Sequence, residues 1–359
     1  MTVVEKSKTE AKLPLDSLEI KGYRCFKELT IPKLARVNLI TGKNNVGKTS
    51  LLEAIWLYTK HGSAVAAYEI LRQRDQLASD GRDIGTEAAL DAFVQFYNTA
   101  SLADLIKDGE LSLSVKGAGL APNDDDQLVL LLNAGRRTLI AGLPGSTNRR
   151  EYSVNVAVGV PLLGTYNLDG LGASYFIGAR GIDRRLRGKL WDEIDLTEHK
   201  VDVITGLTVI SDEIKDVSIR GENATGAGRV PFVRLKSSSK PVPLAVLGDG
   251  TNRIFDLLVA LSNCSAGVLL IDEIENGLHY SVHADIWRTI FELANRLNVQ
   301  VFATTHSWEC IQAFEEALSS SEENDGELIR LEQKNNVIVS TVFEKRRVKV
   351  VAEDWIEVR

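Results

Sequence analysis

The sequence predicts an α/β fold with three layers, and three stretches of the chain support this prediction. Residues 37–55 read as a buried strand, a glycine-rich loop and a helix, in that order. Residues 247–261 form a second glycine turn that leads directly into a helical pattern. Residues 267–273 run through consecutive apolar positions and end in two carboxylates, as expected of a buried parallel strand. Ligands bind at the carboxyl ends of such strands, so these stretches predict one site at one edge of a sheet.

The glycine-rich loop fits the phosphate-binding pattern G-x-x-x-x-G-K-[ST] at every fixed position. Glycines let successive backbone N–H groups surround a phosphate, and the positive end of the following helix points at it. Lys48 would reach the β- and γ-phosphates, while the Thr49 hydroxyl would ligate Mg²⁺. The alternative is a chance glycine-rich turn, which the strand and helix on either side disfavour. The predicted nucleotide-binding residues are Gly42, Asn44, Asn45, Gly47, Lys48, Thr49 and Ser50.

Composition limits the class of protein. A chain of 359 residues with 44% hydrophobic composition can bury one large core or two smaller ones. The net charge of −7 excludes an overall basic footprint for nucleic acid, so any DNA contact would be a local patch. Three scattered cysteines without metal-ligand spacing suit a reducing compartment. No apolar stretch reaches the ~20 residues of a membrane span, and no signal-peptide pattern begins the chain. We therefore expect a soluble, cytoplasmic protein with no membrane partner.

Short strands are predicted ahead of the glycine loop. Residues 18–31 indicate two of them, and residues 37–40 a third that feeds the loop. Tyr23, Arg24 and Phe26 could line the base or ribose of a nucleotide. Packing on the sheet explains the two aromatic side chains at least as well.

The middle of the chain changes its periodicity. Residues 64–97 indicate helices, whereas residues 110–160 switch to alternating runs rich in β-branched and leucine residues. Gln73 or Gln76 could sense a γ-phosphate from the helical stretch. An exposed polar helix face is the alternative interpretation.

A basic cluster at residues 180–189 is followed by a predicted helix start. The cluster could bind phosphates of nucleic acid, or of ATP across an interface, and a solvated basic helix explains it equally well. Residues 195–198 predict a helix start at which Asp195 caps the helix and Glu198 returns to it. The cluster consists of Arg180, Arg184, Arg185, Arg187 and Lys189.

The carboxyl third supplies a second set of candidate residues. Gly248, Asp249 and Gly250 lie just before a helix, where a glycine turn suits a phosphate. Asp272 and Glu273 end the apolar strand that follows. Asp272 would join the Mg²⁺ shell, and Glu273 would polarise the attacking water. The alternative is an acid pair that caps a neighbouring helix, which the P-loop in the same chain disfavours.

Three histidines extend this set. Glu275, His279 and His283 are spaced by four residues and could bind zinc from one helical face, although a single polar face also explains the spacing. His306 ends another apolar strand at 299–305. It could touch the γ-phosphate or the attacking water, and a hydrogen-bonded core histidine is the alternative.

Together these motifs resemble the ABC-type ATPase core of the SMC, RecF and OLD families. The segments LEIKGYRCF, TGKNNVGKTSLLEAI, LGDGTNR, LLIDEIENGLHY and FATTHS are similar to those of short OLD-like ATPases of the AAA15/AAA21 type. The resemblance implies that Gly248–Gly250 is the signature loop, Glu275–Leu278 the D-loop and His306 the switch histidine. The signature departs from the transporter form LSGGQ. Full OLD proteins also carry a carboxyl-terminal TOPRIM nuclease, for which residues 307–359 are too short.

Motifs and resemblance predict a P-loop NTPase fold, an ABC-type ATPase head with a mixed sheet. We expect residues 1–60 and 240–320 to form the nucleotide-binding core. The stretch 60–240 is expected to form an inserted β-rich and helical lobe that completes the head. Residues 321–359 are expected to form C-terminal strands.

Two functional hypotheses share this site. In the first, the chain is a Mg²⁺-dependent ATP hydrolase that dimerises around ATP and acts on DNA, in repair or phage defence. In the second, it is an ATP-gated scaffold or sensor with slow or no turnover, holding a separately encoded effector such as a nuclease. The Glu273 carboxylate favours the first, while the acidic charge and missing nuclease favour the second. An AAA+ motor is disfavoured by the short interval from Gly248 to Asp272, and a transporter ATPase by the amino-terminal strands.

Overall fold

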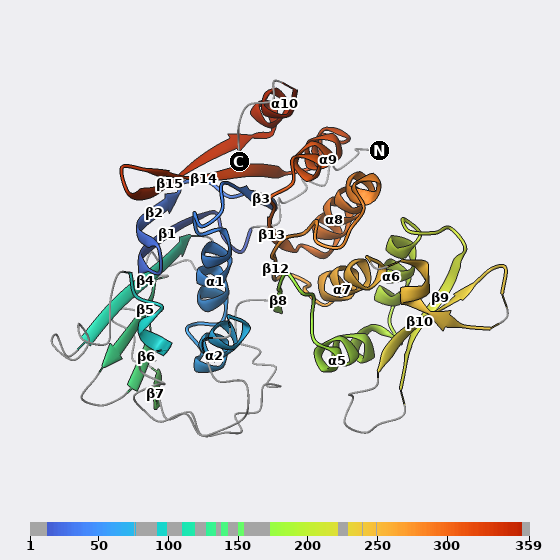
Figure 1. Cartoon of the computed structure of the whole chain (residues 1–359), viewed down its shortest axis with the longest axis horizontal. Helices are drawn as coiled ribbons and strands as arrows, with labels where there is room; N and C mark the ends of the chain where they lie inside the picture. The colour runs from blue at the N-terminus through green and yellow to red at the C-terminus, as the bar shows by residue number, and fades with distance from the viewer. Residues whose placement is uncertain are drawn as a thin grey trace, which may run out of the picture.

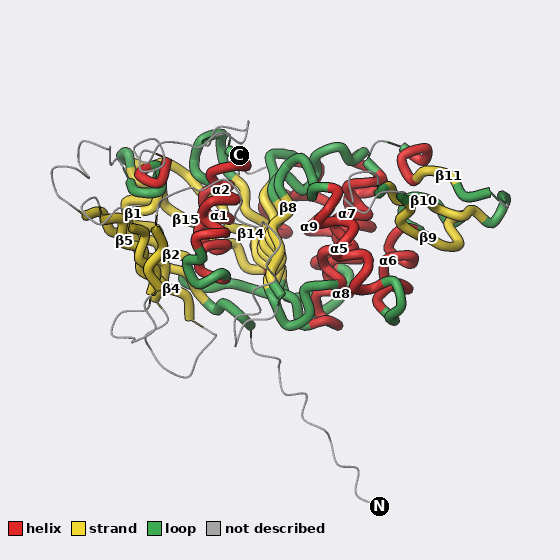
Figure 2. The backbone as a smooth tube through the Cα atoms, turned by 90° about the horizontal axis from the view of Figure 1, so that it is seen from below, coloured by secondary structure: helices red, strands yellow, loops and turns green. Residues whose placement is uncertain are grey.

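Two six-stranded sheets and one three-stranded sheet organise the chain (Figure 1). Figure 2 shows the layers in order: the antiparallel sheet, the helix after the glycine loop, the central sheet, a helical layer and the small sheet. The computed structural model describes residues 13–74, 76, 92–98, 110–118, 127–133, 138–142, 150–153, 173–221, 229–238, 240–248 and 250–353.

The central sheet has the strand order β15-β14-β3-β13-β12-β8. Its neighbours from β14 to β8 all run parallel, and only β15 pairs antiparallel, at the edge. The sheet is therefore mixed, as the sequence predicts. Its strands are β15 (Val337–Glu344), β14 (Gly326–Lys334), β3 (Val37–Thr41), β13 (Gln300–Thr304), β12 (Val268–Ile271) and β8 (Ser174–Ile177).

Strand β12 shows why the buried strands of the central sheet have continuous apolar sequences. Val268 and Leu270 belong to one hydrophobic cluster, and Leu269 and Ile271 to another. Successive side chains of a strand point to opposite faces, so a strand covered on both faces is apolar at every position. Helix α1 covers one face, and the other is covered by helices α7, α8 and α9. These helices are α1 (Lys48–Thr59), α7 (Thr251–Ser262), α8 (His283–Leu297) and α9 (Trp308–Ser319).

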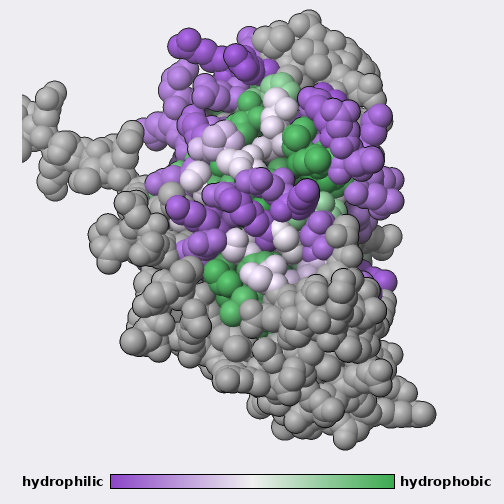
Figure 3. Space-filling model, turned by 90° about the vertical axis from the view of Figure 1, so that its left-hand side faces the viewer, coloured by the Kyte–Doolittle hydropathy of each residue, from purple (hydrophilic) through white to green (hydrophobic). Residues whose placement is uncertain are grey.

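The second sheet is antiparallel throughout, with the order β2-β1-β4-β5-β6-β7. Leu128 and Leu130 are buried at alternate positions of β5, toward α1, which gives the strand its period of two. Figure 3 looks onto this side of the molecule, where hydrophilic residues surround smaller hydrophobic areas. The strands are β2 (Phe26–Ile31), β1 (Ser17–Tyr23), β4 (Glu110–Ala118), β5 (Gln127–Asn133), β6 (Thr138–Gly142) and β7 (Arg150–Ser153).

A helical lobe with the small sheet lies beyond α7 (Figure 1). It consists of α5 (Arg184–Ile194), α6 (His199–Leu207), β9 (Ile214–Arg220), β10 (Val230–Leu235) and β11 (Val242–Pro243).

The predicted cap at Asp195 is wrong. Asp195 closes α5 at its carboxyl end in helical backbone geometry, and the residue before α6, Glu198, makes no side-chain capping bond. The Asp195 carboxylate instead pairs with the ammonium of Lys200, a side chain in the first turn of α6. Asp183 is the residue that caps a helix here, accepting from two backbone N–H groups of α5.

Helix α2 (Ala64–Gln73) confirms the start of the predicted helical stretch. Residues 92–94 form a helical turn, after which Tyr97 bridges to Tyr23 of β1. Residues 77–91 lie outside the described part of the chain. The last described element is helix α10 (Lys345–Glu353), which the prediction of strands over 321–359 did not include.

The sheets do not follow the boundaries expected at residues 60, 240 and 320. The central sheet takes β8 from the middle of the chain and β14 from beyond residue 320, while β1 belongs to the other sheet. The division into a nucleotide-binding core and an inserted lobe stays a prediction. Within the described ranges, no helix is both long and apolar enough to cross a membrane.

Gln300 ties the beginning of the described chain to the central sheet. The side chain is fully buried, donates to the carbonyls of Leu15 and Ala35, and accepts from the Leu15 N–H. Replacing Gln300 with Leu removes these bonds and leaves the buried N–H and carbonyl of Leu15 without this partner, at a cost of about 1–3 kcal/mol for each group, whereas the Ala35 carbonyl still accepts from Asn38. We expect a lower urea midpoint of unfolding with an unchanged slope.

Gln333→Leu is the matched control, because Gln333 is exposed on β14 of the same sheet. Equal midpoints for the two variants would contradict the role given to Gln300.

Candidate functional site

The glycine loop lies between β3 and α1, as the sequence predicts. Gly47 adopts a φ of 91°, a conformation that side chains disfavour. A Cβ at this position would lie 2.4 Å from the Cys25 sulfur and 2.8 Å from the Phe26 ring. Glycine is therefore required because the loop passes so close to the turn between β1 and β2. Asn44 and Asn45 are exposed at the tip of the loop, and Ser50 is buried in the first turn of α1.

The Lys48 ammonium lies inside the loop. Its Nζ donates to the carbonyls of Gly42 at 2.7 Å and Lys43 at 2.9 Å, and the residue is only 6% exposed. Burial lowers the pKa of Lys48 from 10.5 to about 8, although nearby carboxylates favour the charged form. A buried cation held by carbonyl oxygens within a glycine loop is suited to bind phosphate oxygens.

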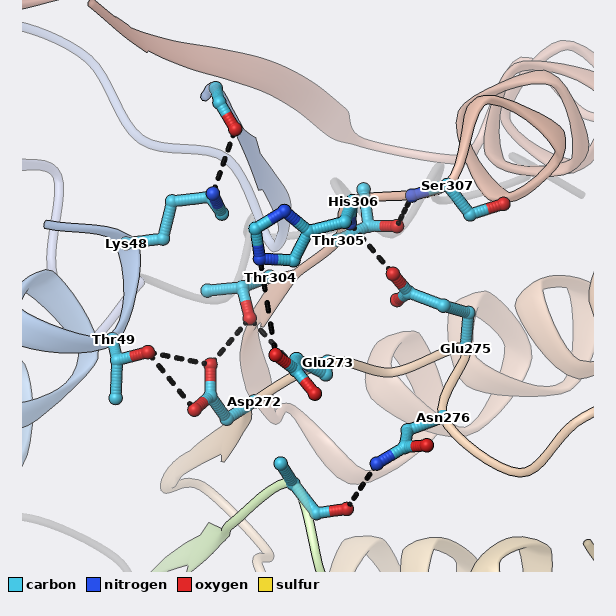
Figure 4. Close-up of polar contacts among 12 residues, drawn as sticks. Lys48, Thr49, Asp272, Glu273, Glu275, Asn276, Thr304, Thr305, His306 and Ser307 are labelled. Atoms are coloured by element: carbon cyan, nitrogen blue, oxygen red, sulfur yellow. Dashed lines mark hydrogen bonds and ion pairs between the residues drawn. The ribbon is translucent and has the colours of Figure 1, made fainter. Parts of the chain in front are cut away.

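Three polar side chains meet at the carboxyl ends of the central strands (Figure 4). The Thr49 hydroxyl lies 3.1 and 3.2 Å from the two oxygens of Asp272. The Thr304 hydroxyl donates to the same carboxylate at 2.6 Å. Parallel strands β12 and β13 end at the same edge of the sheet, beside the N-terminus of α1, and this brings residues 223 positions apart into contact.

Glu273 follows Asp272 in an unusual backbone conformation. Its φ is 49°, in the left-handed region that non-glycine residues rarely adopt. The Glu273 N–H donates to the Thr304 hydroxyl at 2.8 Å, which helps to hold this turn. The carboxylate is 41% exposed, and its Oε1 lies 3.9 Å from Nε2 of His306. The two side chains thus face each other at the open side of the cluster (Figure 4).

The segment Glu275–Leu278 is a turn that contacts two neighbours. The Glu275 carboxylate accepts from the backbone N–H of His306 at 2.6 Å. Asn276 donates to the carbonyl of Ala179, just beyond β8. The segment that the resemblance names the D-loop therefore connects the ends of β13 and β8.

The predicted signature loop lies apart from this cluster. Gly248 is exposed, and Asp249 is outside the described residues. A Cβ on Gly250 would lie 2.3 Å from the carbonyl of Gly277, so this glycine permits close packing on the D-loop. The backbone of Gly248 is hydrogen-bonded to Ala245 and Thr251, and within the described part of the chain it makes no bond to the glycine loop.

Tyr23 and Phe26 are fully buried, which favours packing on the sheet over contact with a nucleotide base. The Arg24 side chain is 8% exposed, lies 2.8 Å from the Glu53 carboxylate and donates to Gln76.

The zinc interpretation is wrong. Glu275 lies in a turn, His279 precedes a short 3-10 segment, and His283 begins α8, so they do not share a helical face. In the described ranges no group of three His, Cys, Asp or Glu residues is placed to hold a metal ion.

The basic cluster divides in two. Arg187 is taken up by a bidentate ion pair with the buried Asp256 of α7, at 2.5 and 2.8 Å. Arg180, Arg184 and Arg185 are exposed.

Two residues of this region escaped prediction. Thr304 joins Asp272 to Glu273, and Arg253 donates to the backbone carbonyls of both acids. The signal for Thr304 was a polar residue at the end of an apolar strand, two positions before His306. For Arg253 it was a charged residue within the apolar stripe of α7.

Comparison with known proteins agrees with this geometry. A family model described as "AAA ATPase domain" matches residues 14–111, and one described as "AAA domain, putative AbiEii toxin, Type IV TA system" matches residues 185–309. A crystal structure of an SMC head bound to the C-winged helix domain of ScpA has the same fold, with a TM-score of 0.54. The match has 13% identity and covers 92% of this chain and 97% of that one. The chain has the P-loop fold of an ABC-type ATPase head, and its matched segments are similar to AAA ATPase domains.

Two curated relatives support this assignment of the ATPase head. An "ATP/GTP phosphatase" of Helicobacter pylori is 21% identical over 371 residues, covering 92% of this chain and 95% of the relative. The DNA replication and repair protein RecF of Pseudoalteromonas translucida is 38% identical over 74 residues, or 20% of each chain. The resemblance seen in the sequence motifs is thereby confirmed at the level of the ABC-type ATPase head.

The lowered pKa of Lys48 predicts pH-dependent nucleotide binding. Without nucleotide the lysine loses its proton near pH 8, and the negative charge of a triphosphate raises its pKa again. Above about pH 8, binding therefore takes up a proton, and the affinity for ATP falls as pH rises, by up to about tenfold per pH unit. Below that pH, Lys48 is protonated in both states and contributes no slope. Titration calorimetry between pH 7 and pH 10 measures this.

Lys48→Arg is the control, because an arginine stays protonated over this range. If wild-type affinity were constant up to pH 10, the lowered pKa or its role in binding would be disproved.

Proposed function

We propose that this ATPase head binds Mg-ATP between the glycine loop and Asp272, and hydrolyses it with Glu273 as the general base. The observation that carries this proposal is the contact of Thr49 and Thr304 with the Asp272 carboxylate, beside the buried ammonium of Lys48. It joins a phosphate-binding loop to acidic residues at the carboxyl edge of a parallel sheet, where ligands bind.

The residues present fit a magnesium ion. Mg²⁺ prefers oxygen ligands and is commonly held by one or two carboxylates plus substrate phosphates. The Thr49 hydroxyl and the Asp272 carboxylate, about 3 Å apart, supply such ligands. When bound, the ion would neutralise charge on the β- and γ-phosphate oxygens.

Glu273 and His306 are assigned to the attacking water. The Glu273 carboxylate is half-exposed and accepts a proton from water in this role, while its backbone is held by Thr304. His306 faces it at 3.9 Å and would orient the water or contact the γ-phosphate. Lys48 would hold the β- and γ-phosphates in place.

The partner proposed for this site is a second copy of the chain. Gly248 is exposed, and among the described residues neither Gly248 nor Gly250 makes a hydrogen bond to the glycine loop of its own subunit. A loop at a helix N-terminus that lies apart from its own site can reach the phosphate held by another subunit. C₂ symmetry would make the contact self-complementary and bury two nucleotides between the heads.

For the biological role we propose action on DNA, in repair or phage defence. The matched segment of a DNA replication and repair protein supports this assignment. The second candidate is an ATP-gated scaffold with slow or no turnover, holding a separately encoded effector such as a nuclease. The net charge of −7 favours that alternative, because it leaves only local patches for nucleic acid.

Glu273→Gln separates hydrolysis from binding. An amide cannot accept the proton of the attacking water, so we expect turnover to fall roughly 10²–10⁴-fold, the usual contribution of a general base. Thermal stabilisation by Mg-ATP should persist, because Lys48 and Asp272 are unchanged. A phosphate-release assay and a thermal shift measure the two properties. Near-normal turnover would assign the base to another residue, and wild-type stabilisation without turnover would favour the scaffold.

ATP-dependent closure of two heads is tested at the signature loop. We expect Gly248→Arg and Asp249→Arg to keep thermal stabilisation by Mg-ATP while preventing dimerisation and hydrolysis, because a bulky cation blocks contact with the second subunit. Light scattering of each variant in the Glu273→Gln background, with and without Mg-ATP, reports the mass. A distance probe between heads detects closure within any constitutive oligomer.

Val337→Arg provides the control, since this residue is exposed at the distant β14–β15 hairpin. Normal hydrolysis by both signature variants, with no ATP-dependent closure in any form, would rule out the dimer mechanism.

A further inference from the structure

Arg253 is a buried cation held entirely by backbone carbonyls. It is 7% exposed, and its guanidinium donates to the carbonyls of Gly178 at 2.6 Å, Asp272 at 2.7 Å and Glu273 at 3.3 Å. Burial lowers the pKa of Arg253, although Asp256, Asp272 and nearby glutamates oppose the shift. Burying a charge is costly without hydrogen bonds, and these three carbonyls supply them to the two terminal nitrogens of the guanidinium.

Two of the three carbonyls that Arg253 contacts, those of Asp272 and Glu273, belong to a strained turn. Glu273 has a φ of 49°, and such conformations persist only where surrounding contacts impose them. Thr304 accepts from the N–H of Glu273, while Arg253 donates to the carbonyls that precede and follow the Glu273 Cα, those of Asp272 and Glu273. The direction of the Glu273 side chain therefore depends on contacts from two different elements, β13 and α7.

Arg253 also lies in the first turn of α7, three residues after Gly250. The loop before this helix packs on the D-loop, because a Cβ on Gly250 would lie 2.3 Å from the Gly277 carbonyl. The Arg253 guanidinium therefore links the N-terminal turn of α7 to the carbonyls of Asp272 and Glu273. No other described side chain of α7 donates to these two residues.

We infer that Arg253 is a positioning residue for hydrolysis: it holds the backbone of Glu273 in its left-handed turn and links the signature-loop helix to that acid. The inference rests on the proposed role of Glu273. Arg253 touches neither nucleotide nor water in this assignment, so it acts on the reaction only through the direction of the Glu273 carboxylate. Contact of the signature loop with a second head could then change the direction of the Glu273 carboxylate through Arg253.

The test compares Arg253→Gln with Arg187→Gln. Arg187 is a matched control, because it also binds α7 through a buried ion pair, with Asp256, but makes no contact with Asp272 or Glu273. We expect Arg253→Gln to lower kcat by about 10²-fold, since a misplacement of about 1 Å at a reacting group has that effect. The KM for ATP should stay within about threefold of wild type. Arg187→Gln should keep kcat within about threefold of wild type. This should hold even if its melting temperature falls as much as that of Arg253→Gln.

Arg253→Lys is a second variant that keeps the inference testable if Arg253→Gln fails to fold. A lysine keeps the charge but presents a single point donor in place of the planar fork that bridges these carbonyls. We expect Arg253→Lys to fold and to lose most of kcat. Full activity of Arg253→Lys, or an equal loss of kcat in Arg187→Gln, would overturn the inference.

Hydrogen–deuterium exchange of the amides of residues 272–276 gives a readout that does not need turnover. In Arg253→Gln these amides should exchange faster than in wild type, and in Arg187→Gln they should not. Unchanged exchange in Arg253→Gln would overturn the positioning role. A wild-type protein without ATP hydrolysis would instead refute the proposed function, and the exchange result would still decide whether Arg253 holds this turn.

Discussion

The Asp272 carboxylate joins the elements on which the site depends. It accepts from Thr49 at the start of α1 and from Thr304 at the end of β13, and it terminates β12 itself. A helix and two strands that are distant in sequence are thereby fixed at one point. The geometry follows from parallel strands, whose carboxyl ends lie at a common edge, so that a polar residue placed just after each strand meets its neighbours there.

Helix α7 carries a second set of contacts to the same edge. Arg253 donates to the end of β8 and to the Asp272–Glu273 turn, and Asp256, one turn later, pairs with Arg187 and accepts from the N–H of Ile182. The helix that begins at the predicted signature loop is therefore tied to the acidic turn by charge-assisted hydrogen bonds. These bonds give a short physical connection between the exposed loop and the proposed base.

The glycine loop between β3 and α1 is held by contacts of its own. Lys48 lies within it on the carbonyls of Gly42 and Lys43, and Gly47 leaves space for the sulfur of Cys25 and the ring of Phe26. The turn between β1 and β2 thus supports the loop from behind. The antiparallel sheet, whose Tyr23 and Phe26 are buried rather than turned toward a nucleotide, contributes to the site by holding the loop in place.

Much of this arrangement was determined by the sequence itself. The glycine loop, the apolar strand before it and the helix after it are local patterns, in which each signal lies within a few residues of the next. The same holds for the buried strand that ends in Asp272 and Glu273, and for the strand that ends before His306. Their meeting at one edge was predictable because parallel strands leave no other arrangement of their carboxyl ends.

Only the tertiary structure decided which distant residues become neighbours. The roles of Thr304 and Arg253 depend on contacts between separate elements, and no short pattern encodes them. The cap assigned to Asp195 failed because the chain stays helical there, a property set by packing rather than by the capping pattern. The position of β8 beside β12 likewise depends on long-range strand pairing. The sequence determines local conformation and burial periodicity, whereas the side chain that orients the acid is chosen by how whole helices and strands pack.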